Sequence, residues 1–207
     1  MTIPTRRAAP RSTLHARAAV RLAWLRGAPA CLLALLLACV TGEARSQPAP
    51  ADVSLEYAVK ATYLYKLAPF VNWPPTTFTA ANEPFRICVA GDDPFGHYLE
   101  KQVAGRSLGT HPFEVRRLDA LTRDAACQIV FISHLPSQSI HDALDAVSGR
   151  PVLTVVDSTA PHQGGIVQFV IQRGRVRFVI DTGEAARNHI TISSKLLNLA
   201  LAVREPT

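Results

Sequence analysis

After residue 50, the first clear pattern of apolar positions has helical spacing. Apolar side chains recur every three or four residues at Tyr57, Ala61, Leu64, Tyr65 and Ala68, which predicts a helix with one buried face. Ser54 is a suitable N-cap for this helix. Pro69 and the Trp73-Pro74-Pro75 run end it, because proline cannot continue a helix.

The middle of the chain contains short apolar runs that predict strands. Residues 85–91 predict a strand with Phe85, Ile87 and Val89 on one face. Residues 129–132 and 152–156 are almost continuously apolar, which is typical of parallel strands covered on both faces. Residues 113–116 alternate between apolar and charged side chains and predict a half-exposed edge strand. These segments therefore predict a sheet with a parallel centre.

Helical patterns separate and follow these strands. Asp93 can cap a helix that has Pro94 at its first position, and Ile140, Leu144 and Val147 share one face of another. Near the end of the chain, Ser193 can cap a last helix. Its predicted core-facing residues are Leu196, Leu199, Ala200 and Val203.

Two apolar segments near the C-terminus predict a β-hairpin. Residues 166–171 and 176–180 flank the Gln172-Arg173-Gly174 turn, and alternation directs Val176, Phe178 and Ile180 inward. The predicted fold is a single-domain α/β sandwich over residues 54–207. Its mixed sheet has a parallel centre and a C-terminal antiparallel hairpin, and helices flank it.

The N-terminus has the composition of an export signal. Residues 6–26 contain six arginines and no acid, residues 30–40 are apolar, and Ala44-Arg45-Ser46 places small residues at a cleavage site. We expect residues 1–46 to be a cleaved signal peptide and residues 47–53 a flexible leader. The apolar run is too short for a typical membrane span, and lipidation at Cys39 is a less favoured alternative.

Removing this signal changes the charge of the protein. Residues 1–46 hold seven of the 22 basic residues and one of the 16 acidic residues, which leaves 15 of each and a neutral domain. The apparent basicity is therefore no argument for nucleic-acid binding. Cys88 and Cys127 also remain, and they are either a disulfide, as export permits, or two buried thiols.

The residues of the domain assemble no recognisable catalytic or metal-binding motif. The Gly91–Gly96 turn matches no nucleotide-binding signature, and its two carboxylates would repel phosphate. The histidines are scattered, without zinc spacing. We therefore expect no enzyme activity, no cofactor and no metal.

Two surface features are candidates for partner binding. Arg173, Arg175 and Arg177 alternate along the second hairpin strand and can meet an acidic partner, although a solvated edge is the more ordinary interpretation. Phe70 and Trp73 belong to an aromatic group around the first helix that frames either a pocket or the core.

The order of short motifs along the domain resembles the YfiR family. These motifs are Ala61-Thr62-Tyr63-Leu64-Tyr65, Phe70-Val71-Asn72-Trp73-Pro74, the run from Phe85 to Gly96, Cys127 to Ser133, Gly174 to Phe178, and Ile192 to Leu197. Cys88 and Cys127 stand where the family has cysteines on neighbouring strands, so the resemblance favours a disulfide. Some relatives in the family have a second cysteine pair, which this sequence lacks.

The resemblance implies a non-enzymatic periplasmic regulator. Such a regulator would bind and restrain the periplasmic domain of an inner-membrane diguanylate cyclase, with candidate contacts at Arg175, Arg177, Phe70 and Trp73. The resemblance also implies a homodimer and, as a further partner, an outer-membrane lipoprotein. The alternative function is a periplasmic small-molecule sensor that acts on another membrane protein.

Overall fold

The structure, a computed structural model, describes residues 50–157 and 164–205. The predicted signal peptide, its cleavage site and Cys39 lie outside this part of the chain. The described elements are α2 (Pro50–Leu67), η1 (Ala68–Phe70), β1 (Val71–Asn72), η2 (Pro75–Thr77), β2 (Phe85–Ala90), α3 (His97–Val103), β3 (Ser107–Leu108), β4 (His111–Leu118), β5 (Ile129–Ile132), α4 (Ile140–Ala146), β6 (Leu153–Asp157), β7 (Val167–Gln172), β8 (Arg175–Asp181), α5 (Thr182–Arg187), β9 (Thr191–Ile192), α6 (Ser194–Leu197) and β10 (Ala202–Arg204).

The large sheet has the order β10-β8-β7-β6-β5-β2-β4-β3. Strands β4, β2, β5, β6 and β7 run parallel to one another, and β7 and β8 form an antiparallel hairpin. This confirms the predicted α/β fold with a parallel centre and a C-terminal hairpin. Short strands β1 and β9 form a separate antiparallel pair.

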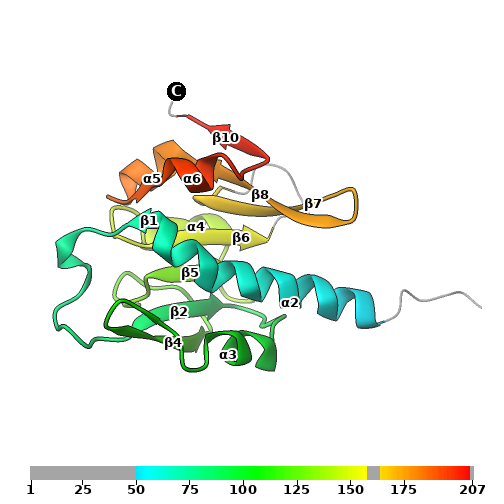
Figure 1. The fold of residues 1–207 in the computed structure, drawn as a ribbon, viewed down its shortest axis with the longest axis horizontal. Helices are drawn as coiled ribbons and strands as arrows, with labels where there is room; N and C mark the ends of the chain where they lie inside the picture. Colours follow the sequence, from blue (N-terminus) through cyan, green and yellow to red (C-terminus); the bar gives the residue numbers. More distant parts are fainter. Residues whose placement is uncertain (1–49, 158–163, 206–207) are drawn as a thin grey trace, which may run out of the picture. The chain divides into compact units, whose positions relative to one another are not determined.

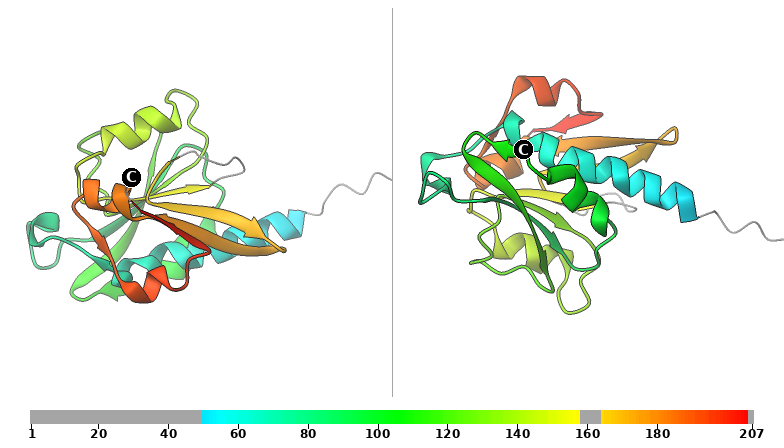
Figure 2. Two further views of the ribbon diagram at one scale, coloured as in Figure 1. Left: turned by 90° about the horizontal axis from the view of Figure 1, so that it is seen from above. Right: turned by 60° about the horizontal axis from the view of Figure 1, so that its bottom comes forward.

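Helices cover both faces of the large sheet, as the nearly continuous apolar strands predicted. Helices α2 and α3 lie on one face and α4 lies on the other, as Figure 1 and the view from above in Figure 2 show. On the first face, Leu64 and Leu67 of α2 pack with Ile87 and Phe131 of the strands. On the second face, Ala143 and Val147 pack with Val130.

The two helices at the N-terminal side of the domain begin at other residues than predicted. Helix α2 begins at Pro50 rather than after Ser54, so its first turn overlaps the predicted leader. Helix α3 begins at His97 and not at Pro94. The reason is that Asp93 Oδ1 accepts hydrogen bonds from the backbone N–H groups of Phe95 and Gly96, which closes a turn before the helix starts.

The end of the chain also differs from the prediction. Ser193 caps α6 as expected, but the helix ends at Leu197, and the following residues form β10 parallel to β8. Leu199 and Val203 were predicted to face the core, and this is wrong, since their side chains are 59% and 40% exposed. These apolar residues have helical spacing in the sequence, but Leu199 lies in an exposed turn and Val203 in an edge strand.

The predicted edge strand around residues 113–116 is longer than expected. Strand β4 spans His111–Leu118 and pairs with β2 along one side, from Phe113 to Leu118. Its other neighbour, β3, pairs with it at two positions. Most of β4 is therefore open on that side, which explains the alternating exposure that the sequence indicated.

Candidate functional site

The first half of α2 and the β7–β8 hairpin extend to the same side of the domain. Their ends lie next to each other in Figure 1 and in the left view of Figure 2. The hairpin closes on a two-residue turn, Arg173-Gly174, in which both residues have positive φ angles, 51° and 70°. This is the conformation of the tight turns that match the twist of paired strands.

A groove of about 790 Å³ lies between these two elements. We call it the hairpin groove. Its walls come from α2, from the hairpin and from the turn after α6, and its lining residues are Leu55, Glu56, Val59, Tyr63, Ile171, Gly174, Arg175, Val176, Arg177, Phe178, Asn198 and Leu199.

The rim of the hairpin groove is unusually apolar for a protein surface. Leu55, Ile171 and Leu199 are 65%, 52% and 59% exposed, although each comes from a different element. At the floor, the Tyr63 ring lies 5.8 Å from the ring of Phe178. Exposed apolar side chains that gather at one hollow mark an interaction site more often than scattered ones do.

One side of β8 is open along the hairpin groove. The backbone N–H of Leu201 donates to the carbonyl oxygen of Phe178 at 2.8 Å, and β10 then pairs with β8 from Val179 to Asp181. Toward the turn, β8 has β7 on one side. On its other side, no strand of residues 50–157 or 164–205 pairs with it before Phe178.

Arg175 and Arg177 stand on this open stretch. Within the described part of the chain, neither guanidinium forms an ion pair or a side-chain hydrogen bond. Arg117, in contrast, contacts both Asp93 and Glu100, and these hydrogen bonds, with Glu100 first, raise its pKa. The two hairpin arginines are therefore cations that the domain itself leaves unmatched.

A buried lysine fixes the α2 wall of the groove. Lys60 is 2% exposed, and its ammonium donates to the two carboxylate oxygens of Asp157 at 2.8 and 3.0 Å and also to Glu56. It lies 4.6 Å from the centre of the Tyr57 ring. Burial, followed by the charge of Asp157, raises the pKa of the Tyr57 phenol to about 12.

The sequence contained a sign of this lysine that the prediction missed. Lys60 lies between Tyr57 and Leu64 at helical spacing, so it stands on the face predicted to be buried. A cation on such a face needs a carboxylate from another element. The exposed leucines of the groove carried no such sign, because their pattern is that of ordinary core residues.

The predicted partner-binding residues lie in two separate places. Arg175 and Arg177 line the hairpin groove, whereas Phe70 lines a second hollow of about 440 Å³ with Tyr65, Leu108 and Phe113. Trp73 packs on Phe85 with ring centroids 5.3 Å apart and donates to the carbonyl oxygen of Ala68. The structure thus does not combine all four residues in one surface.

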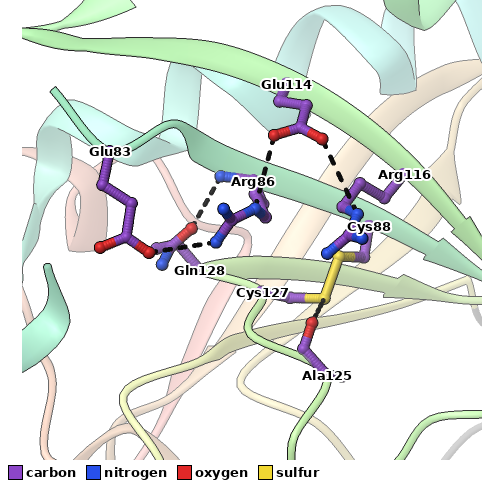
Figure 3. Close-up of a disulfide and its surroundings, with 8 residues drawn as sticks. All are labelled: Glu83, Arg86, Cys88, Glu114, Arg116, Ala125, Cys127 and Gln128. Carbon is purple, nitrogen blue, oxygen red and sulfur yellow. Dashed lines mark hydrogen bonds and ion pairs between the residues drawn. A yellow bond between two sulfur atoms is a disulfide. The ribbon is translucent and has the colours of Figure 1, made fainter. Parts of the chain in front are cut away.

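The cysteines form the disulfide that the family resemblance favoured. Cys88 on β2 and Cys127 before β5 are joined with their Cα atoms 5.9 Å apart, and they are 0% and 4% exposed. Figure 3 shows the bond beside Gln128, whose side-chain oxygen accepts from the backbone N–H of Arg86. The bond therefore joins β2 to the segment that leads into the neighbouring strand β5, within the core under α4.

The other motifs considered in the sequence serve the fold. In the Gly91–Gly96 turn, the second oxygen of Asp93 accepts from Arg117 at 2.8 Å, so this carboxylate is occupied. No three histidine, cysteine or carboxylate side chains gather into a metal site within the described residues. No helix of the described chain is long and apolar enough to span a bilayer. The geometry offers a surface for binding.

Comparison with known proteins agrees with the resemblance found in the motifs. A family model described as YfiR/HmsC-like matches residues 57–201, more than half of the chain. No curated protein sequence matches this chain. The matched region includes both cysteines of the disulfide, the hairpin and most of the groove.

Proposed function

Because this chain belongs to the YfiR/HmsC-like family, we propose that it is a periplasmic regulator that binds the periplasmic domain of an inner-membrane diguanylate cyclase and restrains it. The family is generally regulatory rather than catalytic and points to periplasmic control of diguanylate cyclase signalling. Under this proposal, the protein lowers the cyclic-di-GMP level of the cell by contact and performs no reaction of its own.

The hairpin groove is the observation that supports binding of a partner protein. It combines exposed leucines from two elements, an exposed isoleucine and two unmatched arginines. An apolar centre with charged residues at its edge is the usual composition of a protein interface. We propose that the cyclase docks here and that acidic residues of the cyclase meet Arg175 and Arg177.

The test in cells is the cyclic-di-GMP level of three strains: wild type, a deletion, and the deletion complemented with the gene. We expect a rise on deletion that the full gene reverses. A copy without residues 1–46 should fail to reverse it, because it stays in the cytoplasm. Equal levels in all strains under several growth conditions would contradict the proposal.

The test of the surface is charge reversal. Arg175→Glu combined with Arg177→Glu should abolish the complementation while the protein still folds. Arg123→Glu combined with Arg150→Glu is the matched control, because these arginines are exposed and lie elsewhere. Equal complementation by both pairs would exclude the hairpin groove as the cyclase site.

The aromatic hollow around Phe70 supports a second proposal, that a small molecule tunes the regulator. Tyr65, Phe70 and Phe113 line it, and the Arg106 guanidinium lies 5.1 Å from the Tyr65 ring centre. Such a site suits a flat or apolar ligand with an anionic group. Thermal shifts with nucleotides, amino acids and aromatic acids test it, and Phe70→Ala should remove any shift.

The family resemblance supports two further associations of this protein. We propose that it forms a homodimer and that an outer-membrane lipoprotein binds and sequesters it. Light scattering of the purified domain measures the first. Co-purification from an envelope fraction, with the Arg175/Arg177 double variant as a comparison, measures whether a lipoprotein uses the same groove as the cyclase.

A further inference from the structure

The backbone of the open stretch of β8 is arranged to accept another strand. Leu201 donates to the carbonyl oxygen of Phe178, so the backbone groups of Phe178 point away from β7. Because backbone groups alternate in direction along a strand, those of Val176 point the same way. Val176 is paired with Ile171 of β7 in register, and its N–H and C=O are directed to the open side.

The side chains on this stretch alternate between two chemistries. Val176 and Phe178 face α2 and the hairpin groove, where Leu55 and Leu199 are exposed. Arg175 and Arg177 alternate with them along β8, about 7 Å apart as residues two positions apart in a strand are, and they border the hairpin groove at the open edge of the strand. A strand laid beside β8 would therefore meet an apolar position between two cationic ones.

A second copy of this chain fits that edge poorly. If two β8 strands paired around a twofold axis at Val176, Arg175 of one copy would lie opposite Arg177 of the other, twice. Like charges directly opposite across a strand pair are destabilising. Arginines on an edge strand are also a common means of preventing self-association.

We propose that β8 binds an extended segment of the partner as an added strand, with an acidic–apolar–acidic alternation in that segment. This inference rests on the proposed function and specifies how the partner is recognised. Backbone hydrogen bonds to Val176 provide affinity, and the alternation provides selectivity. The acidic side chains lie opposite Arg175 and Arg177, and the apolar side chain between them enters the hairpin groove against Leu199.

β10 limits the length of this contact. It already pairs with β8 from Val179 onward, and Leu201 occupies the carbonyl oxygen of Phe178, so the added strand has the stretch from Arg175 to Arg177 available. A contact of this length is short for a β-strand. The recognised segment is therefore a brief extended stretch rather than a whole sheet edge.

The test uses a fluorescent, end-blocked peptide of sequence Glu-Val-Glu-Val-Glu and the purified domain, with binding followed by anisotropy. Val176→Pro removes the outward N–H alone and leaves the β7 ladder intact, whereas Val176→Ala keeps this N–H. We expect Val176→Pro to weaken binding about tenfold or more and Val176→Ala to weaken it less. The charge-reversed Arg175/Arg177 variant should not bind, and neither should a Lys-Val-Lys-Val-Lys peptide.

A second measurement avoids dependence on the folding of Val176→Pro. The same acidic peptide methylated on the backbone nitrogens of its second to fifth residues cannot donate to the carbonyl oxygen of Val176 in either strand direction, so it should bind about tenfold more weakly to the unaltered domain. Equal binding of both peptides would overturn strand addition. A domain dimer that Val176→Pro converts to a monomer would also overturn it, because the second copy would then occupy the edge.

The two proposals fail in different experiments. If the peptide does not bind but deletion of the gene raises cyclic-di-GMP, the added strand is wrong and the regulator stands. If the peptide binds as described but cyclic-di-GMP is unchanged in every strain, the edge recognises an acidic strand from another protein and the cyclase is not the partner.

Discussion

Lys60 and Asp157 lie 97 positions apart in the sequence, and yet the Lys60 ammonium is 2.8 Å from a carboxylate oxygen of Asp157. This contact joins α2 to the carboxyl end of β6 and fixes the helix that forms one wall of the hairpin groove. Lys60 is almost fully buried, so its charge depends on this partner and on Glu56.

Removing the carboxylate of Asp157 should destabilise the domain strongly. Asp157→Ala leaves a buried ammonium with one fewer partner, and we expect a loss of about 3 kcal/mol in the free energy of unfolding. Lys60→Met combined with Asp157→Leu should regain most of it, because apolar residues replace both charges. Urea unfolding with an unchanged m-value measures each variant.

The control for this prediction is Asp145→Ala. Asp145 is 67% exposed and contacts His141, so its loss should change the free energy of unfolding by less than about 1 kcal/mol. If Asp157→Ala behaves like this exposed control, the buried contact does not hold α2 in place.

Tyr57 should lose its phenol proton at an unusually high pH. Its pKa is raised to about 12 from 10.0, first by burial and then by Asp157. Between these two pH values, the unfolded chain loses the phenol proton and the folded chain keeps it. Stability is therefore complete below pH 10 and falls as the pH rises toward about 12.

Phenolate absorbance during an alkaline titration measures this pKa. Tyr57→Phe should remove the step of the titration near pH 12. Asp157→Asn should lower the Tyr57 pKa by part of the shift, because burial is the larger cause and remains. If Tyr57→Phe leaves the phenolate absorbance near pH 12 unchanged, the described environment of Tyr57 is wrong.

The disulfide should contribute substantially to stability. It closes a segment of 39 residues, for which the chain-entropy estimate is about 4 kcal/mol. Replacing both cysteines with alanine should lower the free energy of unfolding by an amount of this order. Because both sulfurs are buried, reductant should act slowly on the folded domain, and a thiol count before and after unfolding shows this difference.

Gly91 should not tolerate any side chain. It has a φ angle of +88°, and an added Cβ would lie 2.3 Å from the carbonyl oxygen of His134. Gly91→Ala should therefore cost about 3 kcal/mol of unfolding free energy. Gly149→Ala is the matched control, since its φ is +72° but its added Cβ meets nothing within 4 Å, and it should cost about 1 kcal/mol.

The parallel centre and the hairpin were predictable from the sequence, whereas the groove was not. Continuous apolar runs occur where both faces of a strand are covered, and this holds for residues 129–132 and 152–156. Leu199 and Val203 misled the prediction because helical spacing does not distinguish a helix from a turn followed by a strand. Leu55 is exposed because the β7–β8 hairpin does not cover this part of α2. The position of the hairpin relative to α2 cannot be predicted from the local sequence pattern.

The parallel centre of the sheet sets the order in which the protein can be completed during synthesis. Helix α2 is made first, but the carboxylate that receives its buried ammonium comes at the end of β6, and β8 comes later still. Parallel neighbours cannot be joined by a tight turn, and contacts between distant segments form slowly. The growing chain therefore holds the apolar residues of α2 without their strand partners until β6 has been made.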